Sequence, residues 1–102
     1  MLRVMFHHLV FFYLRKDLTP AQRSDFESKL RGLARIVSIS SCDIGRPAAI
    51  ERAVVDSSYD FGVMLLFKDK AGHDAYQVDP IHQEFVASCK SYWTAVKIYD
   101  FE

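Results

Sequence analysis

The sequence has little cysteine, proline or glycine and no excess of charge of either sign, and each shortage excludes a class of protein. Its 102 residues include two cysteines, three prolines and four glycines. This composition excludes a disulfide-stapled mini-protein, a collagen-like chain and a low-complexity chain. Thirteen basic residues balance thirteen acidic ones, so the formal net charge is zero. The basic surface that nucleic-acid binding requires is therefore not expected.

The spacing of the two cysteines does not match a redox or metal-binding motif. Cys42 and Cys89 lie far apart in the chain, and no Cys-x-x-Cys pair occurs. Reduced thiols that pack as small hydrophobic side chains are typical of cytosolic proteins. We expect a cytoplasmic protein without a disulfide.

Apolar residues, in contrast, are plentiful. They make up half of the chain, and 14% of the residues are aromatic. This predicts a single globular domain over residues 1–102, with enough apolar surface to bury some of it against another subunit. The apolar run from Val4 to Leu14 contains His7 and His8 and is too short to span a bilayer. We interpret it as a buried strand, and not as a signal peptide.

Alternation, helical spacing and capping residues predict the elements in order. We expect strands at 4–14, 36–44, 59–67 and 92–101, and helices beginning near 20, 69 and 80. Thr19, Pro20 and Gln22 form a capping box at the first helix, whose apolar stripe is Phe26, Leu30, Leu33 and Ala34. In the second strand, the apolar alternation changes phase between Val37/Ile39 and Cys42/Ile44, which indicates a bulge. Residues 45–58 form a long loop, and the sequence does not say whether it closes over a site.

With the adjoining helices near 69 and 80 counted as one helical segment, this order is β-α-β-β-α-β. It is the ferredoxin-like α+β arrangement, in which the helices cover one face of a four-stranded antiparallel sheet. The first and third strands are nevertheless apolar on both faces. A bare apolar sheet face is rarely left in water. We therefore expect a homodimer in which two sheets pack face to face and close an α/β barrel.

Three polar aromatic residues are candidates for a site. Tyr76 and His82 stand on either side of the helix start marked by Asp79 and Pro80, and His8 lies in the first strand. An imidazole can remove a proton next to a carbonyl group, and a phenol can stabilise the resulting enolate. Each residue has a second interpretation as a packed core residue whose polar atoms are satisfied internally.

Other candidates are less specific. Val10, Phe26, Val63 and Trp93 are expected to line a ligand pocket or to fill the core. His7 and His73 are expected at the surface or at an interface. Because His7 and His8 point to opposite faces of a strand, they cannot hold one metal ion together, and no metal set or cofactor is predicted.

Three segments resemble a known family. They are His8-Leu-Val-Phe-Phe-Tyr-Leu14, Tyr76-Gln-Val-Asp-Pro-Ile-His-Gln-Glu-Phe85, and Ser91-Tyr-Trp93 leading into Val96-Lys-Ile-Tyr-Asp-Phe101. In order and spacing they resemble the stress-responsive dimeric α/β-barrel (Dabb) proteins. The resemblance implies a ferredoxin-like subunit and a dimeric barrel.

One member of that family is a cofactor-independent cyclase of a linear polyketide. The resemblance implies that its catalytic histidine and tyrosine fall on His82 and Tyr76, and its pocket-lining strand histidine on His8. The cyclase pattern has a histidine where this chain has Asp79, and aromatic residues where it has Glu27 and Leu30. These departures indicate a different substrate.

The sequence thus predicts binding of a small aromatic or polyketide-like carbonyl compound, with cyclisation or isomerisation by a histidine base and a tyrosine hydroxyl. Two alternatives stay open. One is a non-enzymatic, stress-related structural dimer, and the other is a cofactor-free monooxygenase of the dimeric-barrel type. No membrane partner is expected.

Overall fold

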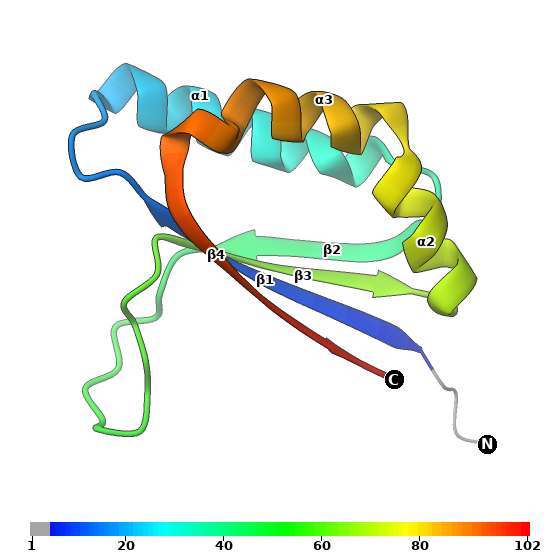
Figure 1. Ribbon diagram of the computed structural model, residues 1–102. Helices are drawn as coiled ribbons and strands as arrows, with labels where there is room; N and C mark the ends of the chain where they lie inside the picture. Colours follow the sequence, from blue (N-terminus) through cyan, green and yellow to red (C-terminus); the bar gives the residue numbers. More distant parts are fainter. Residues whose placement is uncertain (1–4) are drawn as a thin grey trace.

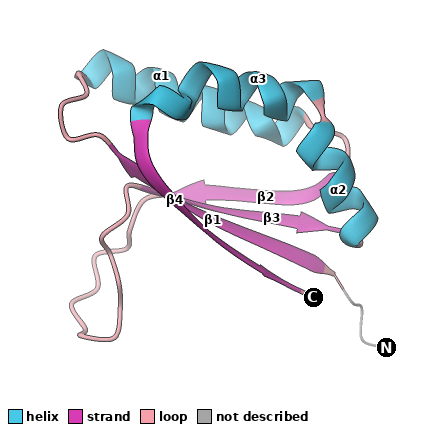
Figure 2. Cartoon of the chain, viewed as in Figure 1, coloured by secondary structure: helices cyan, strands magenta, loops and turns pink. Residues whose placement is uncertain are grey.

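A layer of helices covers one face of a four-stranded antiparallel sheet (Figures 1 and 2). The computed structural model describes residues 5–102. The strand order in the sheet is β2-β3-β1-β4. The elements are β1 (Phe6–Leu14), α1 (Pro20–Arg31), η1 (Gly32–Arg35), β2 (Ile39–Gly45), β3 (Phe61–Phe67), α2 (Lys70–Val78), α3 (Pro80–Cys89), η2 (Lys90–Tyr92) and β4 (Trp93–Phe101). The ferredoxin-like α+β prediction is confirmed, although the expected strand start at Val4 lies outside the described residues.

The helix starts form where the capping residues predict them. The Gln22 amide donates to the Thr19 hydroxyl over 3.1 Å, and the Thr19 amide donates to the Gln22 side chain over 2.8 Å. Asp79 ends α2 and begins α3, with its carboxylate accepting from the Ile81 amide over 2.8 Å. This turn joins the helices that carry Tyr76 and His82.

The core lies between the helices and the sheet. The alternating residues of β1 and β3 that face the helices are buried, as predicted: Phe6, His8, Val10, Phe12, Leu14, Phe61, Val63, Leu65 and Phe67. Phe26 of α1 is fully buried and packs its ring against those of Phe12, Phe61 and Phe85. This aromatic packing holds α1 and α3 on the sheet.

Two details near residue 35 differ from the prediction. Ala34 is exposed, because the chain tightens into a 3-10 turn at Gly32 and Ile36 takes the core position instead. The second strand consequently begins at Ile39, not at Ile36. The predicted bulge is confirmed, since the pairing of β2 with β3 shifts register between Ile39 and Ser41.

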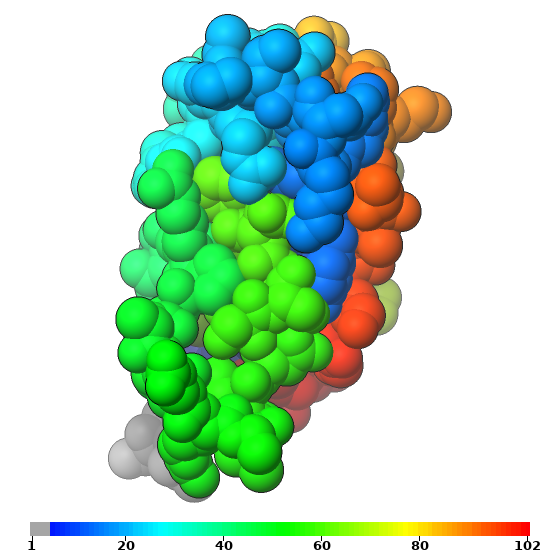
Figure 3. Space-filling view, turned by 90° about the vertical axis from the view of Figure 1, so that its left-hand side faces the viewer, coloured from blue at the N-terminus to red at the C-terminus, as the bar shows by residue number. Residues whose placement is uncertain are grey.

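Within residues 5–102, the opposite face of the sheet carries no helices. Leu9, Phe11, Tyr13 and Met64 are partly exposed there, and β4 adds exposed aromatic side chains at Tyr99 and Phe101. The loop 46–60 leaves the sheet on this side (Figure 1). In Figure 3 the loop, in green, and helix α1, in cyan and blue, lie at opposite ends of the view.

The loop therefore does not cover the space between helices and sheet within its own chain. None of the helices within residues 5–102 is long and apolar enough to cross a membrane.

Candidate functional site

A pocket of about 260 Å³ lies between the sheet and the helices. Its polar lining residues are His8 of β1, Tyr76 and Gln77 of α2, and His82 of α3. Most other lining residues are apolar and include Val10, Phe12, Val63, Phe85, Trp93 and Ile98. A mostly apolar cavity with a few convergent polar groups is typical of small-molecule sites, and this volume lies just below their usual range of about 300–1,000 Å³.

His8 is held by a carboxylate from the neighbouring strand. The register of β1 and β4 places His8 opposite Asp100, and the His8 Nδ1 lies 2.5 Å from the Asp100 Oδ1. The His8 side chain is buried, with 3% of its surface exposed, while the Asp100 side chain is 37% exposed. The structure thus gives Asp100, a residue that the sequence did not single out, as the partner of His8.

This pairing sets the protonation of His8. Burial lowers the pKa of His8 below its usual value, and the hydrogen bond and charge of Asp100 oppose that decrease without cancelling it. The ring is therefore neutral at neutral pH, with its Nδ1–H donating to Asp100. The lone pair lies on Nε2, the form in which imidazole accepts a proton.

His82 is also fixed as one tautomer. Its Nδ1 lies 3.2 Å from the carbonyl oxygen of Gln77, and only an N–H can bond to a carbonyl. Burial lowers the pKa of His82, so this ring too is neutral, with its lone pair on Nε2. The two interpretations of His82 therefore hold together, since it satisfies a backbone carbonyl and also lines the pocket.

Tyr76 lies between the two histidines. Its ring centroid is 4.4 Å from that of His82 and 5.7 Å from that of His8. Burial raises the pKa of Tyr76, so the phenol stays protonated. No hydrogen bond of its hydroxyl occurs within residues 5–102. The hydroxyl is therefore free to donate to a ligand.

The structure brings together most of the residues that the sequence predicted. His8, Val10, Val63, Tyr76, His82 and Trp93 all line the pocket. Phe26 does not, because its side chain is enclosed by the aromatic core. Sequence reasoning missed Gln77 and Asp100. The alternation Val96, Ile98, Asp100 in the last strand was the available signal for Asp100, since it places the carboxylate on the helix side.

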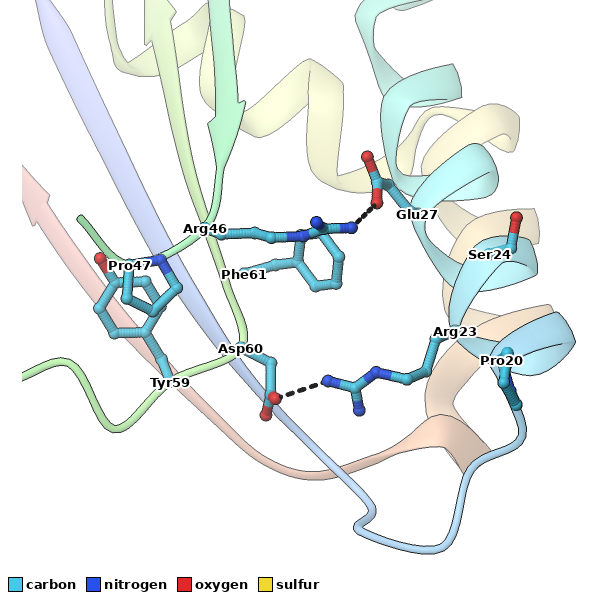
Figure 4. Close-up of a pocket in the computed structure, with 9 residues that line it drawn as sticks. All are labelled: Pro20, Arg23, Ser24, Glu27, Arg46, Pro47, Tyr59, Asp60 and Phe61. Carbon is cyan, nitrogen blue, oxygen red and sulfur yellow. Dashed lines mark hydrogen bonds and ion pairs between the residues drawn. The ribbon is translucent and has the colours of Figure 1, made fainter. Parts of the chain in front are cut away.

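A larger cleft of about 580 Å³ opens between α1 and the ends of the loop 46–60 (Figure 4). Arg23 pairs with Asp60 over 2.9 Å, and Arg46 pairs with Glu27 over 2.8 Å while its guanidinium lies 5.4 Å from the Phe61 ring centroid. Each guanidinium thus already has a carboxylate partner. Despite its larger size, this cleft presents no free charge to a ligand, and the apolar pocket is the better candidate site.

Comparison with known proteins identifies the family of the chain. The family model for the stress responsive A/B barrel domain matches residues 6–102. No curated protein matches the chain.

Solved structures share the fold over nearly their full length. A Dabb family protein with a ferredoxin-like fold from Mesorhizobium loti has 22% identity and a TM-score of 0.79, covering 96% of this chain and 95% of that one. A dimeric ferredoxin-like protein of unknown function from Jannaschia sp. CCS1 has 27% identity and a TM-score of 0.71, with coverages of 97% and 99%. The hydroxynitrile lyase of Passiflora edulis has 16% identity and a TM-score of 0.78, with coverages of 95% and 91%.

Proposed function

Because the chain belongs to the stress-responsive A/B barrel (Dabb) family, we propose that its pocket binds a small aromatic or polyketide-like carbonyl compound and catalyses proton transfer on it. One observation carries the proposal. Two imidazoles and a tyrosine side chain line one apolar cavity, and burial shifts the pKa of each toward its neutral form. Base and hydrogen-bond donor are both side chains, so the proposed cyclisation or isomerisation needs no cofactor.

The proposed reaction begins with removal of a proton from the carbon next to the carbonyl group. Tyr76 donates a hydrogen bond to the carbonyl oxygen and stabilises the enolate as its charge develops. His8 is the better base, because Asp100 stabilises the imidazolium that forms when Nε2 takes the proton. Among residues 5–102, His82 bonds to a carbonyl oxygen and not to a carboxylate, and it is assigned to a second oxygen of the ligand. This modifies the prediction from the sequence, in which His82 was the base.

We also propose that two chains form a homodimer through their open sheet faces. The apolar residues Leu9, Phe11, Met64, Tyr99 and Phe101 lie together on that face, and apolar patches of this kind mark interaction sites. The Jannaschia protein with the same fold is described as dimeric. The loop 46–60 extends on the same side (Figure 1).

Cytoplasmic location stays a prediction, based on two cysteines that are free in the structure.

The proposal is tested with a panel of aromatic 1,3-diketones and linear β-polyketide thioesters. Binding is measured by calorimetry and product formation by chromatography. The panel includes a cyanohydrin, because a hydroxynitrile lyase has this fold. Saturable binding with turnover supports the proposal. Binding without turnover favours the non-enzymatic alternative, turnover that consumes oxygen favours the monooxygenase, and no binding by any compound contradicts the ligand class.

Replacing Tyr76 by phenylalanine is expected to lower kcat by about 10²- to 10³-fold, the usual cost of losing one oxyanion donor. The ring and its packing stay, so the free energy of unfolding changes little. Tyr99→Phe removes an exposed hydroxyl from the open face and serves as the control, with unchanged kcat. Equal kcat in the wild type and the Tyr76→Phe variant would show that the hydroxyl takes no part in the reaction.

A further inference from the structure

We propose that His8, His73 and Asp100 form a binding site for a divalent transition-metal ion. The three side chains come from β1, α2 and β4. Each offers one ligand atom, and these atoms lie within 4.8 Å of one another. Two of the three ligands, His8 and Asp100, also take part in the proposed proton transfer, and a bound ion would replace the hydrogen bond between them. Sequence spacing gave no sign of the metal site, because the three residues are far apart in the chain.

The spacing of the ligand atoms suits one ion after a small adjustment. Ligands at 2.0–2.1 Å from a zinc ion lie roughly 3 to 3.5 Å from one another. The 2.5 Å contact between His8 and Asp100 must therefore open slightly, and His73 must move inward. His8 is buried and fixed in the sheet, whereas Asp100 is partly exposed and lies in edge strand β4. Asp100 can therefore make the adjustment at small cost.

His73 already has the tautomer that coordination needs. Its Nδ1 donates to the Asp74 Oδ1 over 3.2 Å, and its Nε2 accepts from the side-chain amide of Gln77 over 3.3 Å. The Nε2 lone pair is therefore available once Gln77 turns away. A carboxylate on the far nitrogen of an imidazole is the usual outer support of a metal-binding histidine. Stacking on Phe6, at 4.5 Å between ring centroids, fixes the ring plane.

The donor set selects the class of ion. Two imidazoles and one carboxylate favour zinc, cobalt, nickel or ferrous iron, while magnesium and calcium prefer oxygen ligands alone. Three protein ligands leave at least one coordination position open. His8 and Gln77 both line the apolar pocket, so the open position lies at the polar end of that pocket.

The test is titration of the chelator-treated full chain with Zn²⁺ by calorimetry and with Co²⁺ by visible absorption. We expect one ion per chain and Co²⁺ ligand-field bands. His73→Gln is expected to weaken binding at least about tenfold, as loss of even an outer-shell partner does. His7→Gln is the matched control, because His7 lies on the opposite face of β1 and its loss is expected to leave the affinity unchanged.

Two results would overturn the site. One is no saturable binding to the wild type, and the other is equal affinity of the wild type and His73→Gln. Circular dichroism checks the fold of each variant, and Asp100→Asn supplies the same test if His73→Gln unfolds. His73 does not line the apolar pocket, so His73→Gln is expected to keep its affinity for the 1,3-diketone probe. Failure of the metal site is thereby separated from failure of the carbonyl site.

Discussion

Replacing Asp100 by asparagine is expected to lower kcat for a 1,3-diketone or polyketide substrate by about 10²- to 10⁴-fold, the range over which a positioned base contributes. The carboxylate accepts the Nδ1–H of His8 at 2.5 Å, which fixes the basic lone pair on Nε2 and stabilises the imidazolium. Asparagine has no charge to stabilise that ion, and its amide can hold the wrong tautomer. We expect KM to change far less than kcat, because the apolar lining of the pocket is untouched.

The matched control for this variant is Asp17→Asn, which removes the same charge from a side chain that is 70% exposed and is expected to leave kcat unchanged. The ring nitrogen signals of His8, followed by NMR, report whether its tautomer changes. Unchanged kcat in Asp100→Asn would contradict the assignment of His8 as the base. His82, the base predicted from the sequence, would then take that role.

Replacing Phe11 by aspartate is expected to convert the proposed homodimer into a monomer. Phe11 lies on the open sheet face and packs against Tyr59 and Tyr99, with ring centroids 4.9 and 6.2 Å away. In a face-to-face dimer the aspartate would be buried without a partner, at a cost of roughly 3–5 kcal/mol. This corresponds to a dimer Kd weakened by about 10²- to 10³-fold or more. Sedimentation velocity over a dilution series measures the change.

Val37→Asp is the control for the dimer prediction, because it introduces the same charge at a side chain that is 94% exposed on the connection after η1. It is expected to leave the dimer intact. A wild-type chain that sediments as a monomer would contradict the dimer itself. A Phe11→Asp chain that folds and stays dimeric would place the interface elsewhere.

Local patterns were sufficient to predict most of the fold. Alternation identified the buried face of β1 and β3, and the capping residues Thr19 and Asp79 located the helix starts to within one residue. Asp79 also explains why Tyr76 and His82 could be paired from the sequence, since the turn between their helices is short and local. The Ala34 error arose because helical periodicity does not reveal where a helix tightens into a 3-10 turn.

The missed parts of the site depend on contacts between distant segments. His8 and Asp100 are 92 residues apart, and only the register of β1 with β4 makes them neighbours, because a shift of one residue would turn Asp100 to the other face. Phe26 illustrates a different limit. An apolar side chain that fills the core and one that lines a cavity have the same sequence pattern, so packing alone decides between them.

The most direct test of the proposed site is a long-range ¹H–¹⁵N NMR spectrum of the histidine rings, recorded with and without a saturating aromatic 1,3-diketone. We expect His8 and His82 to be neutral, to carry the proton on Nδ1, and to show shifted ring nitrogen signals when the ligand binds. The signals of His7, on the opposite face of the sheet, are expected to stay in place. A ligand that binds without moving the signals of His8 and His82 would show that the two imidazoles do not form one site.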